Sequence, residues 1–205
     1  MFNLNDLSKD TVIFISGTPC TGKTTVANDL NDYLSDNGFN SKLIKINDFA
    51  IENDLVLGED PDKFYKVIDI DKLNDCLNIE INNFKQSRGS DDFTYKKVSV
   101  LIVEGHLSHL CEGADKMIVL RLNPSFLEER LKERNYSKSK IEENLESEAL
   151  AVCSAEAYDI YGEKAHEIDV SDKSIEETRD LILEIVTGNL ESPLGSIDFM
   201  EWFLK

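Results

Sequence analysis

The sequence predicts an α/β fold, a parallel β-sheet flanked by helices, and three observations support this prediction. Short apolar segments alternate along the chain with longer segments whose apolar residues recur at helical spacing. Residues 98–103 and 116–122 are largely apolar throughout, as in strands that a parallel sheet buries on both faces. Residues 17–24 form a glycine-containing turn between the first expected strand and the first expected helix.

The turn at residues 17–24 has the pattern G-x-x-x-x-G-K-T. Backbone N–H groups of such a loop face inward around phosphate oxygens, and the N-terminus of the following helix adds partial positive charge. Lys23 would reach the β- and γ-phosphates, and the Thr24 hydroxyl would ligate Mg²⁺. The alternative is an ordinary βα turn, but the strand before the loop and the amphipathic helix after it favour a phosphate-binding loop.

The first half of the chain contains three expected strands, at residues 12–17, 41–46 and 98–103. Two clear helices are expected at residues 22–37, ending at Gly38, and from Leu73 to Phe84 and on to about Arg88. Between them, residues 48–57 give a weak helical pattern and residues 58–61 form a turn. The acidic, aromatic stretch that follows, up to Ile70, is ambiguous.

The second half continues the alternation with a strand at residues 116–122. Asn123-Pro124 is a favourable N-cap and N1 pair, which begins a helix that breaks at residues 135–137. Ser139 and Glu142 form a capping-box pattern, which predicts one long helix to about Gly162. The last expected elements are a strand at residues 165–170 and a helix from Ser174 to Val186 that Gly188 stops.

The chain of 205 residues is strongly acidic, with 40 Asp and Glu against 22 Lys and Arg and a formal net charge of −18. This charge disfavours direct binding to free nucleic acid, and it suits either a basic protein partner or simply a well-solvated surface. The four cysteines have neither metal-binding nor redox spacing, and no apolar run would span a bilayer. We therefore expect a single cytoplasmic domain without a signal peptide or a membrane partner.

Functional side chains are expected just after the strands, because open parallel sheets bind ligands at the carboxyl ends of their strands. Glu104 and His106 follow the strand at residues 98–103. Glu104 would hold the Mg²⁺ shell or a water molecule, and His106 would orient a water molecule or a phosphate. The alternatives are a loop carboxylate for Glu104 and a structural histidine for His106. His109 is expected to be a partly buried packing residue.

Arg130 and Arg134 are four residues apart on an expected helix, so their side chains point to one side. Two guanidinium groups in one space match the charge on a transferring phosphoryl group. Arg121, at the end of its strand, is a third candidate. The alternative for Arg130 and Arg134 is surface pairing with the acidic residues of their own helix.

Together these segments resemble the atypical adenylate kinases of ribosome assembly, whose eukaryotic members are called coilin-interacting nuclear ATPase. The resemblance covers about residues 11–188, and the form of residues 104–110 is similar to the archaeal branch. It is carried by residues 17–25 (GTPCTGKTT), 103–110 (VEGHLSHL), 119–121 (VLR), 129–136 (ERLKERNY), 140–144 (KIEEN) and 146–149 (ESEA).

The resemblance implies a P-loop NTPase fold of the nucleoside monophosphate kinase type, with a five-stranded parallel sheet in a single domain at residues 1–188. The implied activity is broad-specificity phosphoryl exchange, chiefly ATP and AMP giving two ADP, with Mg²⁺ and with ATPase activity beside it. The implied setting is late maturation of the small ribosomal subunit. There the partners would be a basic platform protein of that subunit and, transiently, the precursor particle.

The resemblance also assigns site residues. The lid would span about residues 133–144, and the segment that binds the nucleoside monophosphate about residues 45–68. The ATP-binding candidates are Cys20 (through its backbone), Gly22, Lys23, Thr24, Thr25 and Arg134. Taken together with the reasoning from the residues themselves, the catalytic candidates are Lys23, Glu104, His106, Arg130 and Arg134, and the Mg²⁺ candidates are Thr24 and Glu104.

Three departures from the family pattern affect these expectations. Cys20 replaces a usual Gly and crowds the loop, whereas Asn135, which also replaces a Gly, tolerates a left-handed conformation. Residues 45–68 contain no Arg, and Ile51 stands where many members have a basic residue. The monophosphate would then depend on a cation other than an Arg of this segment; the candidates are Lys63, Lys66 and Arg88. Without one, AMP would bind poorly and ATPase would be the main activity; a small-metabolite kinase is a further alternative.

The tail at residues 189–205 is apolar for a chain end, with Phe199, Trp202 and Phe203 among its members. It would either dock on a partner or pack back on its own domain, and we expect the second.

Overall fold

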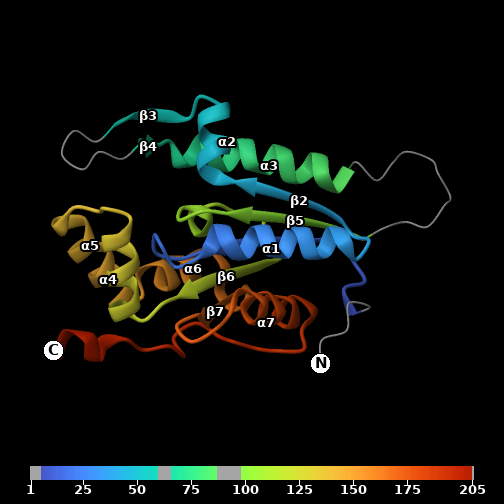
Figure 1. Ribbon diagram of the computed structural model, residues 1–205. Coiled ribbons are helices and arrows are strands. Elements are labelled where there is room, and N and C mark those ends of the chain that lie inside the picture. The colour runs from blue at the N-terminus through green and yellow to red at the C-terminus, as the bar shows by residue number, and fades with distance from the viewer. Residues whose placement is uncertain (1–5, 60–65, 87–97, 205) are drawn as a thin grey trace.

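The computed structural model describes residues 6–59, 66–86 and 98–204. A five-stranded parallel sheet with strand order β2-β5-β1-β6-β7 forms the centre of the molecule (Figure 1). Its strands are β1 (Thr11–Ser16), β2 (Asn40–Lys45), β5 (Ser99–Glu104), β6 (Lys116–Arg121) and β7 (Ala165–Asp169). The predicted sheet is therefore confirmed, and each expected strand lies within about one residue of its predicted bounds.

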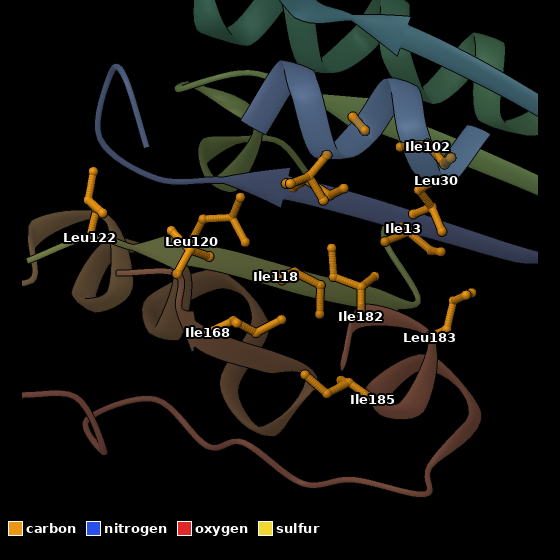
Figure 2. Close-up of a cluster of buried hydrophobic side chains, with 14 of the residues drawn as sticks. Ile13, Leu30, Ile102, Ile118, Leu120, Leu122, Ile168, Ile182, Leu183 and Ile185 are labelled. Atoms are coloured by element: carbon orange, nitrogen blue, oxygen red, sulfur yellow. The ribbon is translucent and has the colours of Figure 1, made fainter. Parts of the chain in front are cut away.

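Helices cover both faces of the sheet. They are α1 (Lys23–Asp36), α2 (Ile46–Glu52), α3 (Ile70–Gln86), α4 (Pro124–Glu133), α5 (Lys138–Ala149), α6 (Val152–Tyr161) and α7 (Ile175–Thr187). Because successive strand residues point to opposite faces, Ile13 packs with α1 and α7 whereas Phe14 packs with α3 and α6. Figure 2 shows the first of these layers, in which Leu30 and Ile182 lie beside the sheet residues Ile13 and Ile118.

The ambiguous stretch before Ile70 contains a second, small sheet. Strand β3 (Val56–Glu59) pairs with β4 (Lys66–Ile68) in antiparallel orientation. The weak helical pattern at residues 48–57 extended too far, because α2 ends at Glu52 and Asp54 has a φ of 57°. A left-handed residue cannot continue a helix, so the chain turns there into β3. The predicted turn at residues 58–61 lies partly outside the described residues.

The prediction of one long helix from Ser139 to Gly162 is wrong at its start and in its middle. Ser137 is the N-cap, and its hydroxyl accepts a hydrogen bond from the Lys140 N–H at 3.4 Å. The helix then divides into α5 and α6 at Ala151, whose φ is 55°. Alanine is the strongest helix former, so the sequence carried no local signal for this break. Packing decides it, because α5 joins the core layer of α1 and α6 joins the opposite layer.

The left-handed Ala151 leads to a prediction about stability. Replacing Ala151 by Gly should raise the free energy of unfolding by about 0.5–1 kcal/mol, because Gly adopts this conformation without the Cβ clash. The matched control is Ala155→Gly, which lies exposed inside α6 and should lower stability by about 1 kcal/mol. Urea denaturation measures both, and a destabilised Ala151→Gly variant would show that the strain at this position is negligible.

Several other predicted helix ends are confirmed, whereas the end predicted at about Arg88 lies outside the described residues. The Asn123 side chain accepts a hydrogen bond from the Ser125 N–H at 3.0 Å, and Ser174 and Glu177 form a capping box. Gly38 and Gly188 have positive φ values after their helices, and Asn135 is left-handed as predicted, with a φ of 57°. Within the described part of the chain, every helix is too short or too polar to cross a bilayer.

The tail packs on its own domain, as we expected. The Glu167 N–H donates to the Ser192 carbonyl at 2.9 Å, so the tail adds to the edge strand β7. It then runs toward the end of the molecule that carries α4 and α5 (Figure 1), and Trp202 packs against the core. Trp202 belongs to a short 3₁₀ helix (Met200–Leu204), in which Leu204 is 85% exposed.

Candidate active site

A pocket of about 520 Å³ opens at the carboxyl ends of β1 and β5. This is the edge at which a parallel sheet of this kind binds its ligands. The phosphate-binding loop, α2, the loop after β5 and the α4–α5 segment all contribute to its wall. The lining residues include Cys20, Gly22, Lys23, Thr24, Thr25, Asn47, Glu104, His106, Arg134, Tyr136, Lys140, Glu143, Asn144 and Ser147.

The backbone of the phosphate-binding loop is tightly constrained. Gly17 has a φ of 136°, and a Cβ at this position would lie 2.4 Å from the Leu120 carbonyl oxygen. Only glycine fits there. The Thr18 carbonyl accepts hydrogen bonds from the Thr21 N–H at 3.3 Å and the Thr21 hydroxyl at 2.9 Å. The loop is thus held as a closed turn that leads into α1.

Lys23 is buried at the base of this loop. Its ammonium group donates to the Gly17 and Thr18 carbonyl oxygens, each at 2.8 Å. Burial lowers the pKa of Lys23, and the nearby Glu104 carboxylate is among the groups that oppose this shift. A buried ammonium group that bonds to loop carbonyls is well placed to exchange them for phosphate oxygens.

Thr24 and Glu104 meet across the pocket. The Thr24 hydroxyl lies 3.1 and 3.2 Å from the two carboxylate oxygens of Glu104. Burial raises the pKa of Glu104, while the Thr24 hydroxyl and Lys23 counteract this shift. Hydroxyl and carboxylate oxygens suit Mg²⁺, which typically takes one or two protein ligands beside phosphate and water. The donor set therefore fits Mg²⁺, as the sequence predicted.

His106 and His109 differ in their surroundings. His106 lines the pocket, and burial lowers its pKa to about 4, so its imidazole is neutral at pH 7. His109 is buried outside the pocket, where Nδ1 lies 2.6 Å from the Ser16 hydroxyl and Nε2 lies 2.8 Å from the Glu156 carboxylate. Burial also lowers the pKa of His109. His109 thus links β1 to α6, which is more than the packing role predicted for it.

The lowered pKa of His106 predicts a pH dependence of stability. The unfolded chain binds a proton at His106 near pH 6.5, but the folded chain binds it only near pH 4. Stability should therefore be lost as the pH falls from 6.5 toward 4. We expect His106→Asn to remove about 1 kcal/mol of the loss between pH 7 and pH 5, allowing for its partial exposure. Urea denaturation at both pH values tests this, with His109 unchanged in both proteins; equal losses in the two would contradict it.

The three candidate arginines lie in different places. Arg134 lines the pocket, whereas the Arg130 guanidinium contacts the loop backbone, 3.3 Å from the Cys20 carbonyl and 3.5 Å from the Thr21 carbonyl. Arg130 therefore braces the loop from outside the pocket. Arg121 does not face the phosphate site at all. It is 1% exposed and pairs with Glu148 and Glu167, so its predicted place beside Arg134 is wrong.

Cys20 adopts a left-handed conformation of the kind that glycine favours. Its φ is 71°, which strains a residue with a side chain, and the residue still lines the pocket. In the segment at residues 45–68, Asn47 lines the pocket and Ile51 is 46% exposed. Lys66 lies exposed on β4 and is not a pocket residue. Lys63 and Arg88, the other candidate cations for a monophosphate, lie outside the described residues.

The sequence did not indicate that Glu148 holds the phosphate-binding loop through Thr18. The Thr18 hydroxyl donates to Glu148, which is 1% exposed. The sequence did indicate that Glu148 is buried, because it lies three residues after Leu145 and seven after Ile141, on the inward face of α5. The identity of its partner depends on the tertiary fold and carried no local signal.

The parallel sheet, the phosphate-binding loop and the Thr24–Glu104 pair define a P-loop kinase fold with a site for a nucleoside triphosphate and Mg²⁺. The family AAA_18, described as an AAA domain, matches residues 13–151. An uncharacterized protein from Eubacterium ventriosum has a similar fold, with a TM-score of 0.51 and 12% identity over 88% of this chain and 99% of its own.

Close relatives come from archaea. A protein of Methanothermobacter thermautotrophicus described as "Putative adenylate kinase" is 38% identical over 94% of this chain and 99% of its own length. A protein of Methanococcus maripaludis with the same description is 38% identical over 93% of this chain and 96% of its own. The chain belongs to this archaeal family of P-loop nucleotide kinases.

Proposed function

We propose that this protein is a broad-specificity adenylate kinase that converts ATP and AMP to two ADP, and that it also hydrolyses ATP. One observation carries the proposal. The phosphate-binding loop with Lys23, the Thr24–Glu104 pair and the guanidinium of Arg134 all face one pocket. The names of the archaeal relatives support the same activity.

In the proposed reaction, a phosphate oxygen of AMP attacks the γ-phosphorus of ATP, and the bond to the β-phosphate oxygen breaks. Two ADP result, and no atom is left over. Lys23 would give up its carbonyl partners for the β- and γ-phosphates, and Arg134 would neutralise charge on the transferring group. Thr24 and Glu104 would hold Mg²⁺, which would supply positive charge to neutralise the phosphates. Positioning and charge neutralisation supply most of the rate, so a strong base is not required.

The ATPase activity rests on His106. Its imidazole is neutral and lines the pocket together with Glu104, and a neutral imidazole can both accept and donate a hydrogen bond, which suits a side chain that orients a water molecule. The absence of Arg from residues 45–68 favours water as a frequent acceptor in place of AMP. The alternative function is therefore an ATPase with little kinase activity.

We also propose that the protein acts in the cytoplasm during late maturation of the small ribosomal subunit. The support is the resemblance of its motifs to assembly factors and the net charge of −18, which suits a basic ribosomal platform protein. The charge disfavours binding to free RNA and leaves contact with the precursor particle to that protein partner. Nucleotide state would then alter a loop at the pocket and with it the affinity for the partner.

One experiment separates these activities. ADP formation from Mg-ATP is measured without acceptor, with AMP, with a non-nucleotide acceptor, and with a basic small-subunit ribosomal protein. Strong stimulation by AMP would establish the kinase. Turnover that is independent of AMP but raised by the ribosomal protein would establish the assembly ATPase. Stimulation only by a non-nucleotide acceptor would overturn both in favour of a small-metabolite kinase.

His106→Gly tests the hydrolytic role within this assay. The variant should lower AMP-independent turnover about tenfold or more, the usual range for a positioned proton-transfer or water-orienting group. Its dissociation constant for Mg-ATP, measured by calorimetry, should change less than about threefold, because Lys23 and the loop remain. Unchanged hydrolysis would show that His106 has only a packing role.

A further inference from the structure

A series of buried polar side chains, joined by hydrogen bonds, begins at the phosphate-binding loop. The Thr18 hydroxyl donates to one carboxylate oxygen of Glu148, and the other oxygen accepts from Arg121 Nε at 2.8 Å and the Leu122 N–H at 3.0 Å. Arg121 also donates to the Glu148 carbonyl at 2.7 Å. Glu148 therefore fixes the position of Thr18, whose carbonyl in turn holds Lys23 and Thr21.

The same series of hydrogen bonds ends at the C-terminal tail. Arg121 donates to Glu167 at 3.1 Å, and Glu167 is 0% exposed. The second carboxylate oxygen of Glu167 accepts from the Ile197 N–H at 2.7 Å and the Ser196 hydroxyl at 3.3 Å. Both of these donors belong to the tail. The ring of Phe199 also covers Arg121, with the guanidinium carbon 5.2 Å from its centroid.

The charges of Glu148, Arg121 and Glu167 make the hydrogen bonds of these three residues depend on one another. Two buried carboxylates share one guanidinium, so the negative charge exceeds the positive and must be compensated by hydrogen-bond donors. If the tail withdraws its donors, Glu167 competes more strongly for Arg121. Arg121 is then a weaker partner for Glu148, and Glu148 is a less fixed acceptor for Thr18.

We propose that the C-terminal tail is a positioning element for the phosphate-binding loop, and that Glu148, Arg121 and Glu167 form the relay between them. The affinity for ATP would thus depend on a segment that runs along the edge strand β7 and whose described residues do not line the pocket. The inference builds on the proposed function only in its use of ATP as the ligand of the loop. A partner that lifts or presses the tail would alter nucleotide affinity through this relay.

Ile197 allows a test in the full-length chain. Ile197→Pro removes the N–H that bonds to Glu167, whereas Ile197→Ala, the matched control, removes the side chain but keeps the N–H. Calorimetry with Mg-ATP measures the dissociation constant of each, and thermal unfolding is recorded in parallel. We expect Ile197→Pro to weaken ATP binding about three- to tenfold, in the range of couplings within one hydrogen-bonded network, and Ile197→Ala less than about twofold.

Thr18 tests the other end of the relay. Thr18→Val, which loses the hydroxyl, should weaken ATP binding to a similar extent, and Thr18→Ser should restore it. In the Thr18→Val background, Ile197→Pro should add less than about twofold, because the connection to the loop is already broken. If Ile197→Pro does not fold, Phe199→Leu replaces it, since this variant loses only the ring over Arg121.

The outcomes are distinct. In one outcome, Ile197→Pro and Ile197→Ala bind ATP with equal affinity and differ only in a lower unfolding temperature for Ile197→Pro. That result would show that the tail contributes to stability alone, and it would overturn the inference. Full additivity of Thr18→Val and Ile197→Pro would overturn the relay. Failure of the wild-type protein to bind Mg-ATP would instead defeat the proposed function itself, and the inference with it.

Discussion

Replacing Lys23 by Met is expected to lower ADP formation by at least about a hundred- to thousandfold, whichever acceptor is supplied. Lys23 is the buried cation at the base of the loop, and its ammonium group bonds only to the Gly17 and Thr18 carbonyl oxygens in the described structure. Removal of one preorganised donor from a reacting oxyanion usually costs a rate factor of this size. Both kinase and ATPase turnover should fall together, because both need the γ-phosphate to be held.

The fold should survive this substitution. Met has a similar length and is apolar, and burial already disfavours the charged form of Lys23. The matched control is Lys42→Met, because Lys42 lies on the edge strand β2 and pairs with Glu80 at the surface at 2.9 Å. Its turnover should match the wild type. If Lys23→Met, shown to be folded by its unfolding temperature, kept near-normal turnover, the assignment of the loop as the catalytic phosphate site would be wrong.

The features that the sequence predicted correctly are those with local causes. The turn at residues 17–24, the helix start at Ser174 and the helix stop at Gly188 each depend on residues within a few positions of one another. The five strands were predicted from short apolar runs, because the apolar composition of such a run is enough to indicate a buried strand. Thr24 and Glu104 were expected to lie close together because parallel strands bring their carboxyl ends to one edge of the sheet, and their side chains do meet there.

The features that the sequence did not predict have tertiary causes. Ala151 breaks a helix because α5 and α6 pack into different layers, although alanine itself favours helix. Arg121 was expected to face a phosphate, since a strand-end arginine in such a fold is a reasonable phosphate ligand. Its partners, Glu148 and Glu167, are 27 and 46 residues away, and no local pattern indicates that they converge on it. The positive charge of Arg121 is compatible with both a ligand site and a structural ion pair, so it did not distinguish the two.

Arg121 is also the subject of the prediction with the largest expected effect on stability. Arg121→Met should lower the free energy of unfolding by about 3–5 kcal/mol, because it leaves two buried carboxylates without their shared cation. For a domain of this length the unfolding temperature should fall by roughly 10 °C. Met fills most of the volume of the arginine stem, so the loss reports on charge rather than on a cavity.

Arg179→Met is the matched control for this prediction. Arg179 also contacts two carboxylates, Asp29 at 3.1 Å and Asp180 at 2.8 Å, and lies over the Tyr33 ring, but these acids are open to solvent. Removal of Arg179 should therefore cost about 1 kcal/mol, since water can solvate the remaining acids. Replacing Glu148 and Glu167 by Gln in the Arg121→Met chain should recover part of the loss, because the unpaired charges are removed. If Arg121→Met were no more destabilising than Arg179→Met, the buried relay would not hold β6, α5 and β7 together.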